Sequence, residues 1–252
     1  MPINRMVIVS KNNSLVKELS SLKEKKFRKR SGTFLVEGEK MVREAVACGM
    51  NVRMLAVRDG YEGETYSLPT TVFGEDAFKA ICDEKTPQGI CAVVEIPTFS
   101  VHAPKESCLV LDGVSDPSNV GAIIRTANAA GYREVYLIDC ADPFSPKSVR
   151  ASMSGVFFVR VMQGTKEEIL SVLDGISFLA ADMNGENLFT FQAPAKFALC
   201  IGNEGNGLSA SVRERADYTV RIPMDKNTES LNAAVSASVA MYLLKQKQFQ
   251  LQ

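Results

Sequence analysis

The sequence predicts an α/β protein of two consecutive units, a small α/β unit followed by a larger unit with a parallel sheet. Apolar runs of strand length alternate with helical patterns along most of the 252 residues. The stretch 97–107 contains two prolines and has little periodicity, which is typical of a linker. Beyond it, three apolar runs end in loops rich in Gly, Asn and charged residues. These observations predict two domains, 1–96 and 108–252, joined by the linker 97–107.

In the first unit, short apolar runs alternate with segments of helical spacing. Leu15, Leu19 and Leu22 recur at that spacing, and Gly49 is placed to end a helix. Helices are predicted for 12–30, 37–48 and 75–82, and strands for 33–36, 52–57 and 89–95. The pattern indicates a small alternating α/β domain.

In the second unit, the apolar runs are longer and more regular. The fully apolar run 108–111 is typical of a strand buried on both faces of a parallel sheet. Strands are predicted for 108–111, 135–138, 157–161, 177–181, 197–201 and 218–222, and helices for 119–130, 166–173 and 228–247. This alternation predicts a parallel sheet with helices on both faces.

Composition excludes several classes of protein. With 46% hydrophobic and 23% charged residues, the chain is typical of a soluble protein, and we expect it in the cytoplasm. The apolar run 6–9 is too short for a signal-peptide core, and no stretch approaches the roughly 20 apolar residues of a membrane span. The six cysteines are scattered without CxxC spacing, which favours free thiols over disulfides or a metal site.

Formal charge is zero, with 29 basic and 29 acidic side chains, but one segment is strongly basic. Six cations lie within eight residues: Lys23, Lys25, Lys26, Arg28, Lys29 and Arg30. Such a cluster is compatible with a solvated helix face and with an RNA-binding surface, where Phe27 would be available to stack on a base. The sequence leaves both interpretations open.

Three loops follow apolar strands of the second unit, at 112–121, 202–209 and 222–232. Ligands of open α/β sheets bind outside the carboxyl ends of the strands, so we expect these loops to converge on one site. The spacing of Gly202, Gly205 and Gly207 differs from the dinucleotide fingerprint and from the phosphate loop, and Glu204 between them would repel phosphate. A nucleotide-binding Rossmann enzyme is therefore not favoured. The small residues of the last helix fit close packing, within the chain or against a second subunit.

Taken together, the three loops resemble the motifs of the SpoU (TrmH-like) class of SPOUT RNA 2′-O-ribose methyltransferases. The motifs lie at 119–126, 201–209 and 222–236, in the family's order and spacing, and the resemblance covers about residues 108–247. The first unit is similar to the L30e-like substrate-binding domain that precedes many of these catalytic domains. The resemblance implies a trefoil-knotted, Rossmann-like catalytic domain that uses S-adenosylmethionine and forms homodimers, without a metal.

The resemblance also implies roles for particular residues. Backbone at Gly202, Ile222 and Leu231 would hold the adenosine part of S-adenosylmethionine, and Arg125 would activate the ribose hydroxyl. The remaining polar motif positions that would shape the site are Asn119, Glu204, Ser230 and Asn232.

A ribose hydroxyl is a poor nucleophile until its proton is removed or polarised. The only histidine, His102, lies in the linker and is badly placed to act as the base. Making an arginine neutral near pH 7 costs roughly 7 kcal/mol. We therefore hypothesise that Arg125 acts at least partly as a cation, fixing a substrate phosphate and stabilising the developing alkoxide.

The two-domain layout resembles ribosomal RNA enzymes of the family more than the tRNA enzymes, so we expect 23S rRNA over tRNA as the substrate. One alternative is a non-catalytic RNA-binding protein with a degenerate methyltransferase fold, against which the intact motif positions argue. A zinc deaminase is excluded by the single histidine and the absence of CxxC.

Overall fold

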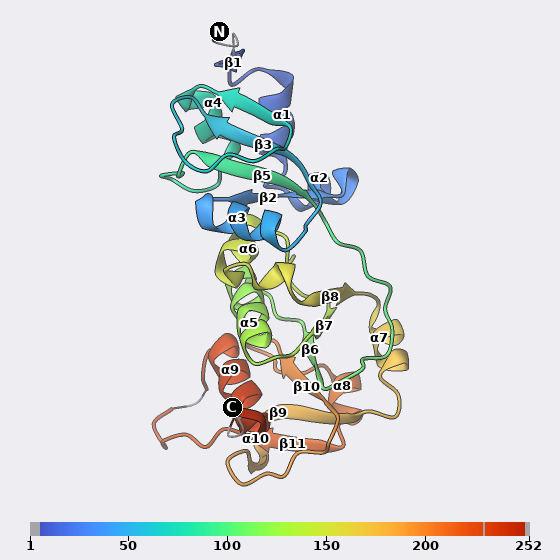
Figure 1. Ribbon diagram of the computed structural model, residues 1–252. Helices are drawn as coiled ribbons and strands as arrows, with labels where there is room; N and C mark the ends of the chain where they lie inside the picture. Colours follow the sequence, from blue (N-terminus) through green and yellow to red (C-terminus); the bar gives the residue numbers. More distant parts are fainter. Residues whose placement is uncertain (1–5, 229, 250–252) are drawn as a thin grey trace. The chain divides into compact units, whose positions relative to one another are not determined.

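Alternating strands and amphipathic helices build two separate α/β units in the computed structural model, which describes residues 6–228 and 230–249 (Figure 1). The first unit comprises the described residues up to Pro97, and the second begins at Thr98. The segment Phe144–Arg150 packs with the first unit although it lies within the range predicted for the second. Its Phe144 ring is buried, with its centroid 5.1 Å from that of Phe34.

The sheet of the first unit has the strand order β1-β4-β3-β5-β2, with β1, β4 and β3 mutually parallel and β5 antiparallel to both its neighbours. The strands are β1 (Val7–Ile8), β2 (Thr33–Glu37), β3 (Val52–Arg58), β4 (Thr70–Phe73) and β5 (Ile90–Glu95). The helices are α1 (Ser14–Ser21), α2 (Lys25–Ser31), α3 (Glu39–Ala47) and α4 (Glu75–Ile81). β1 and β4 are missing from the predicted elements because both are too short to show a period.

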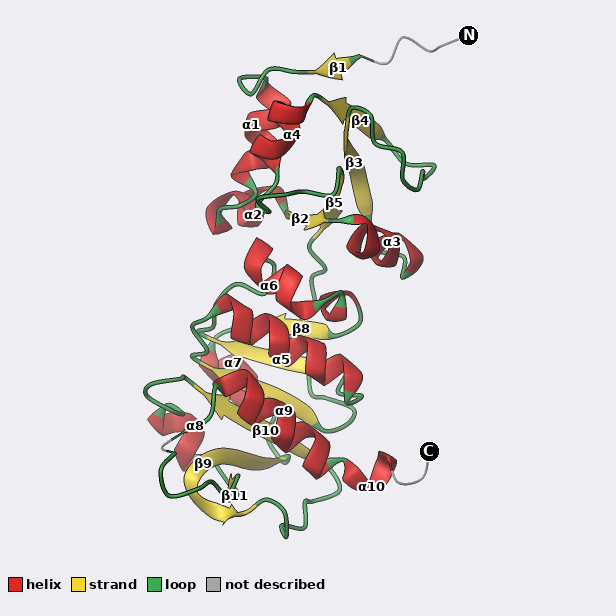
Figure 2. Cartoon of the chain, turned by 90° about the vertical axis from the view of Figure 1, so that its left-hand side faces the viewer, coloured by secondary structure: helices red, strands yellow, loops and turns green. Residues whose placement is uncertain are grey.

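One face of this sheet is covered by α1 and α4, which lie side by side in Figure 2. Leu19 of α1 and Phe78 of α4 belong to one buried cluster with Phe73 and Cys91 from the strands. The helices therefore bury the apolar face that their spacing predicted.

The single helix predicted for 12–30 is wrong, because the chain turns between α1 and α2. Arg28 causes the break: its guanidinium is buried and donates two hydrogen bonds of 2.7 Å, to the carbonyl oxygens of Leu22 and Lys23. These carbonyls follow the last turn of α1 and have no partner within that helix. A side chain from six residues ahead thus satisfies the helix end and fixes the turn.

The parallel sheet predicted for the second unit is confirmed. Its six strands pair in parallel, in the order β11-β9-β10-β6-β7-β8. The strands are β6 (Cys108–Asp112), β7 (Glu134–Ile138), β8 (Arg160–Gln163), β9 (Ser177–Asn187), β10 (Phe197–Gly202) and β11 (Tyr218–Arg221). The helical segments are α5 (Pro117–Ala129), α6 (Pro146–Ser152), η1 (Gly155–Phe157), α7 (Lys166–Val172), α8 (Ala210–Glu214), α9 (Ala233–Leu244) and α10 (Gln246–Phe249).

Helices cover both faces of this sheet, as the alternation predicted. α5 and α9 pack against each other on one face (Figure 2), and Thr126 and Ser238 join them through a 2.9 Å hydrogen bond between their hydroxyls. On the opposite face, Ile169 of α7 and Val212 of α8 belong to one buried cluster with Phe178 of β9.

Two elements of the second unit differ from the prediction. The last helix begins at Ala233 and not near 228, because the Asn232 side chain accepts the backbone N–H of Ala234 at 2.9 Å and caps the helix there. The strand predicted for 157–161 is a short 3₁₀ turn followed by β8, which begins three residues later at Arg160.

Replacing Arg28 should destabilise the first unit. In Arg28→Met the stem remains but the hydrogen bonds to the end of α1 are lost, which should lower the free energy of unfolding by about 1.5–3 kcal/mol. Denaturant titration followed by circular dichroism measures this change. Lys29→Met, at an exposed neighbouring position, should stay within about 0.5 kcal/mol of wild type. Equal stability of the two variants would contradict the assigned role.

Candidate active site

Two loops meet at the carboxyl ends of the neighbouring strands β6 and β10. The carboxylate of Asp112, at the end of β6, is buried and accepts the backbone N–H of Ser209 at 2.6 Å. The Asn203 side chain donates to the carbonyl oxygen of Gly113 at 2.8 Å. Each loop is therefore fastened to the strand that carries the other.

The loop after β10 folds back on itself as a tight turn. Asn203 and Gly207 exchange backbone hydrogen bonds of 2.9 and 3.0 Å, and the Asn203 side chain accepts the N–H groups of Gly205 and Asn206. Gly207 has a φ of +67°, which favours glycine. A Cβ on Gly202 would overlap the backbone of Gly207 and Leu208, so the turn lies directly against Gly202.

Three of the predicted site residues form one hydrogen-bonded chain across all three loops. Glu204 accepts the Asn119 side-chain amide at 2.8 Å, and the Asn119 oxygen accepts the Asn232 amide at 3.0 Å. Asn119 is buried at the start of α5, whereas Asn232 caps α9. The structure thus brings together residues that are 113 positions apart in the chain.

Glu204 is held as a carboxylate by this arrangement. Partial burial raises the pKa of its carboxyl, but the hydrogen bonds from the Asn119 amide and from backbone N–H groups, including those of Ser115 and Asp116, outweigh burial. The net result is a pKa below the usual value. Glu204 therefore makes a structural contact in which its negative charge is an acceptor for several donors.

Arg125 lies outside the hydrogen-bonded chain. Its side chain is exposed on α5, and among the described residues its guanidinium has no ion-pair or hydrogen-bond partner. Each residue of an α-helix rotates the side-chain direction by about 100°, so the Arg125 side chain, six residues after Asn119, points in a different direction. The backbone at Arg125 is closely packed, since a Cβ on Gly155 would lie 3.0 Å from the Arg125 Cα. The guanidinium is thus available to a substrate while its backbone is fixed.

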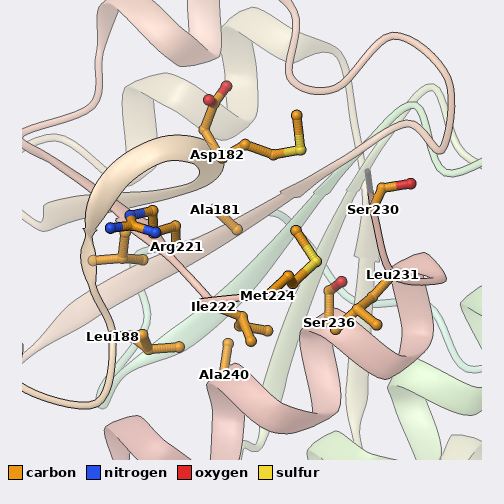
Figure 3. Close-up of a pocket in the computed structure, with 12 residues that line it drawn as sticks. Ala181, Asp182, Leu188, Arg221, Ile222, Met224, Ser230, Leu231, Ser236 and Ala240 are labelled. Atoms are coloured by element: carbon orange, nitrogen blue, oxygen red, sulfur yellow. The ribbon is translucent and has the colours of Figure 1, made fainter. Parts of the chain in front are cut away.

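An apolar cavity of about 120 Å³ opens beside these loops (Figure 3). Ile222 and Leu231 line it, together with Met224 and Leu188. A wider cavity of about 520 Å³ adjoins it and is lined by backbone and side chains from Gly202 to Gly207. Ser230 and Leu231 line both cavities. The predicted cofactor positions therefore share one connected space.

This space fits S-adenosylmethionine. The apolar part suits a flat adenine ring, and the turn against Gly202 lets backbone groups approach the nucleoside closely. The adjoining part is lined by Asp182, Glu204 and Arg213, and the Arg213 guanidinium lies 3.8 Å from the Asp182 carboxylate. The carboxylate of Glu204, which has no ion pair among the described residues, favours a positively charged sulfonium.

Residues 181–188 contribute to the site although they are absent from the predicted site residues. Asp182 and Met183 line both cavities, and they lie where β9 departs from its pairing with β11. The pairing shifts from Thr219–Ala180 to Val220–Glu186, so residues 181–185 arch out over the space. The polar stretch that follows the apolar run 177–181 was the available sequence signal.

The basic segment of the first unit is only partly exposed. The Lys23 ammonium donates to the carbonyl oxygen of Ala80 at 2.8 Å, and Arg28 is buried. The exposed cations are Lys25, Lys26, Lys29 and Arg30. Lys26 and Arg30 both lie 4.8 Å from the centre of the Phe27 ring.

Within the described residues, no cluster of three or more His, Cys, Asp or Glu side chains could hold a metal ion. All six cysteines are free, and burial raises the pKa of Cys108 to about 12. No helix in the described ranges is long and apolar enough to cross a membrane.

Comparison with known families identifies both units. Residues 106–242 match the SpoU rRNA Methylase family, and residues 13–92 match the MRM3-like substrate binding domain. A Bacillus subtilis protein named 23S rRNA (guanosine(2553)-2′-O)-methyltransferase RlmP is 35% identical over 94% of this chain and 98% of its own length. A Streptomyces viridochromogenes protein named 23S rRNA (uridine(2479)-2′-O)-methyltransferase is 29% identical over 93% of this chain and 90% of its own length.

Solved structures of similar proteins support the same family assignment. The SpoU methyltransferase AviRb from Streptomyces viridochromogenes, in complex with the cofactor AdoMet, has a TM-score of 0.87 at 28% identity and covers 94% of this chain and 99% of its own. An AdoMet-bound rRNA methyltransferase from Sinorhizobium meliloti has a TM-score of 0.87 at 26% identity and covers 96% of this chain and 98% of its own. The chain belongs to the SpoU rRNA methylase family and is an S-adenosylmethionine-dependent RNA ribose-2′-O-methyltransferase with a substrate-binding domain ahead of its catalytic domain.

Proposed function

We propose that this enzyme methylates a ribose 2′-hydroxyl in 23S rRNA. The observation that carries the proposal is that relatives named for 23S rRNA match the chain across both units. A structure described for 2′-OH methylation of C/U34 on tRNA covers only 57% of this chain but 97% of its own. A tRNA substrate is therefore less favoured. The two 23S relatives are named for different nucleotides, so the nucleotide is not carried over.

In this proposal, the connected cavities hold S-adenosylmethionine. Backbone at Gly202, Ile222 and Leu231 surrounds the adenosine, and Ser230 lies where the two cavities meet. When bound, the cofactor supplies a methyl group on a positively charged sulfur. The chain of Glu204, Asn119 and Asn232 holds the three loops in the shape that positions the cofactor.

Arg125 is proposed to meet the substrate as a cation. Its exposed guanidinium is suited to pair with an RNA phosphate and to stabilise the alkoxide that develops as the ribose hydroxyl loses its proton. The fixed backbone at Arg125 limits the conformational freedom that this contact would otherwise cost.

RNA is further proposed to contact the exposed cations of α2, namely Lys25, Lys26, Lys29 and Arg30. Lys23 and Arg28 from the predicted cluster have structural roles in the turn and contribute to this surface indirectly.

A homodimer through the catalytic domain is proposed from α9. Its small residues, such as Ala237, face the core, while Val235 and Tyr242 are 48% and 44% exposed on the outward side. Val235, Val239 and Tyr242 follow helical spacing, which makes an apolar stripe. A second copy of the same helix is self-complementary to such a stripe.

The direct test of function is methyl transfer from labelled S-adenosylmethionine to separated 23S rRNA, 16S rRNA and tRNA. We expect label in 23S rRNA, located on ribose after digestion, and a loss of at least about a hundredfold in Arg125→Ala because a transition-state contact is removed. Calorimetric titration of the variant with S-adenosylmethionine is the control and should match wild type. Label on tRNA alone, or on a base, would overturn the proposal.

Glu204→Gln should weaken cofactor binding about five- to tenfold, because the amide presents an N–H to groups that are themselves donors. The lowered pKa means that Glu204 stabilises the fold above its unfolded value near 4.5, and this contribution is lost as pH falls through the folded value. The difference in melting temperature between wild type and variant should therefore be constant from pH 6 to 8 and shrink below about pH 4.5.

Glu214→Gln, an exposed carboxylate on α8, is the matched control and should change neither property. A pH-independent difference for Glu204→Gln would contradict the electrostatic role of its carboxylate.

Val235→Glu should convert the dimer into a monomer, because a charge would be buried without a partner in the apolar stripe. Sedimentation velocity at micromolar concentration distinguishes the two states. Ser171→Glu, on the exposed side of α7, introduces the same charge elsewhere and should leave the dimer intact. A wild-type protein that sediments as a monomer would refute the proposed dimer.

A further inference from the structure

A second cavity lies in the first unit, apart from the cofactor site. It has a volume of about 200 Å³ and is lined by the sheet and by the loop 59–69 that joins β3 to β4. Its floor is apolar and closely packed, because Leu55, Val57, Val72 and Ile90 are almost completely buried. Sites for drug-sized molecules occupy about 300–1,000 Å³, so this cavity has room for a single ring system.

The wall of the cavity includes a tyrosine that two glycines hold in place. A Cβ on Gly89 would lie 3.0 Å from the Tyr61 ring, and a Cβ on Gly63 would overlap its hydroxyl. Gly89 also has a φ of +98°, so both its backbone conformation and the nearby Tyr61 ring require a glycine at this position. The Tyr61 hydroxyl is shielded from water, and the Glu39 carboxylate and the Glu64 backbone lie beside it: burial, then the charge of Glu39 and a hydrogen bond to its carboxylate, raise the pKa of this hydroxyl. Tyr61 therefore contributes its aromatic ring to the cavity wall, while its hydroxyl has the Glu39 carboxylate as an acceptor.

The same loop also presents an acceptor to the cavity. Tyr66 donates its hydroxyl to the Glu64 carboxylate at 2.9 Å. Burial, followed by this bond and the charge of Glu64, raises the pKa of Tyr66 to about 12, so the hydroxyl stays protonated. Glu64 retains lone pairs for a ligand. Two carboxylates, Asp59 and Glu64, and one guanidinium, Arg58, line the cavity, and Arg58 is already paired with Glu75 at 3.3 Å. Arg43 lies near enough to the Tyr66 hydroxyl to lower its pKa, although the opposing effects are larger. A phosphate is disfavoured here, and a neutral ring with N–H donors is favoured.

We propose that this cavity binds an unpaired guanine base of the substrate RNA. Guanine carries two adjacent N–H donors, on N1 and N2, that match the two oxygens of one carboxylate, which in this cavity is Glu64. The tyrosine rings supply the apolar surfaces on which unpaired bases of structured RNA stack. The proposal rests on the proposed RNA substrate and on the match of residues 13–92 to a substrate-binding domain. The base held here is a recognition contact, separate from the methylated nucleotide.

The test uses the full-length protein, saturated with S-adenosylhomocysteine to occupy the cofactor site. Saturation-transfer NMR with GMP, AMP, CMP and UMP should detect binding that prefers GMP. Glu64→Gln should weaken the affinity for GMP by about tenfold or more, because one acceptor oxygen becomes an amide donor. The remaining side-chain oxygen of the glutamine still accepts the hydrogen bond from Tyr66. Glu62→Gln makes the same charge change in the same loop, outside the cavity lining, and should bind GMP like wild type.

Methyl transfer adds a second readout. Glu64→Gln should raise the KM for the RNA and leave kcat unchanged, since the cavity contacts the substrate away from the reaction. Absent GMP binding, a preference for AMP, or equal GMP binding by wild type and Glu64→Gln would each overturn the guanine site. GMP binding is independent of methyl transfer, so a protein that binds GMP through Glu64 but methylates no RNA would refute the proposed function alone.

Discussion

The in-register parallel pairing of β6 with β10 is the constraint on which the catalytic unit depends. These strands pair from Cys108–Ala198 to Asp112–Gly202, so they end at the same level of the sheet. Two loops that are ninety residues apart in the sequence therefore leave the sheet side by side. The Asp112 carboxylate and the Asn203 amide then fasten each loop to the opposite strand. Without this registration neither the turn against Gly202 nor the cavity beside it would have a fixed shape.

The chain of Glu204, Asn119 and Asn232 extends this constraint to a third segment. The Asn232 side chain makes two kinds of hydrogen bond: its oxygen accepts a backbone N–H and caps α9, and its nitrogen donates to Asn119. The start of α9 is thereby coupled to the position of Glu204. Leu231 precedes this cap directly and lines the cavity, so disorder at the start of the helix would change the shape of the cavity. Hydrogen bonds of this kind are costly to break singly, because each loss leaves a donor or acceptor without a partner.

The sequence predicted what local patterns encode and missed what distant contacts decide. The parallel strands and three loops were predictable because apolar runs and Gly-Asn-rich segments are local signals, and the motif resemblance supplied the site residues. The break between α1 and α2 at Leu22 was not predictable, because it depends on a tertiary contact of Arg28. The arch of β9 over the cavity arises from a shift in its pairing with β11, and polar residues such as Asp182 give no local sign of that partner. The trefoil knot implied by the resemblance stays a prediction.

Asn119 and Arg125 lie on the same helix, α5, but make different contacts. Asn119, at the buried start of the helix, orders the loops through its bonds to Glu204 and Asn232. Arg125 lies six residues further on and points elsewhere, so it contributes nothing to that order and is free to meet RNA. A residue that must engage a phosphate gains from being outside the network, since no existing ion pair has to be broken first. Close packing of Gly155 against the Arg125 backbone fixes its Cα, and among the described residues its guanidinium is unpaired. This combination supports the proposal that Arg125 acts on the ribose.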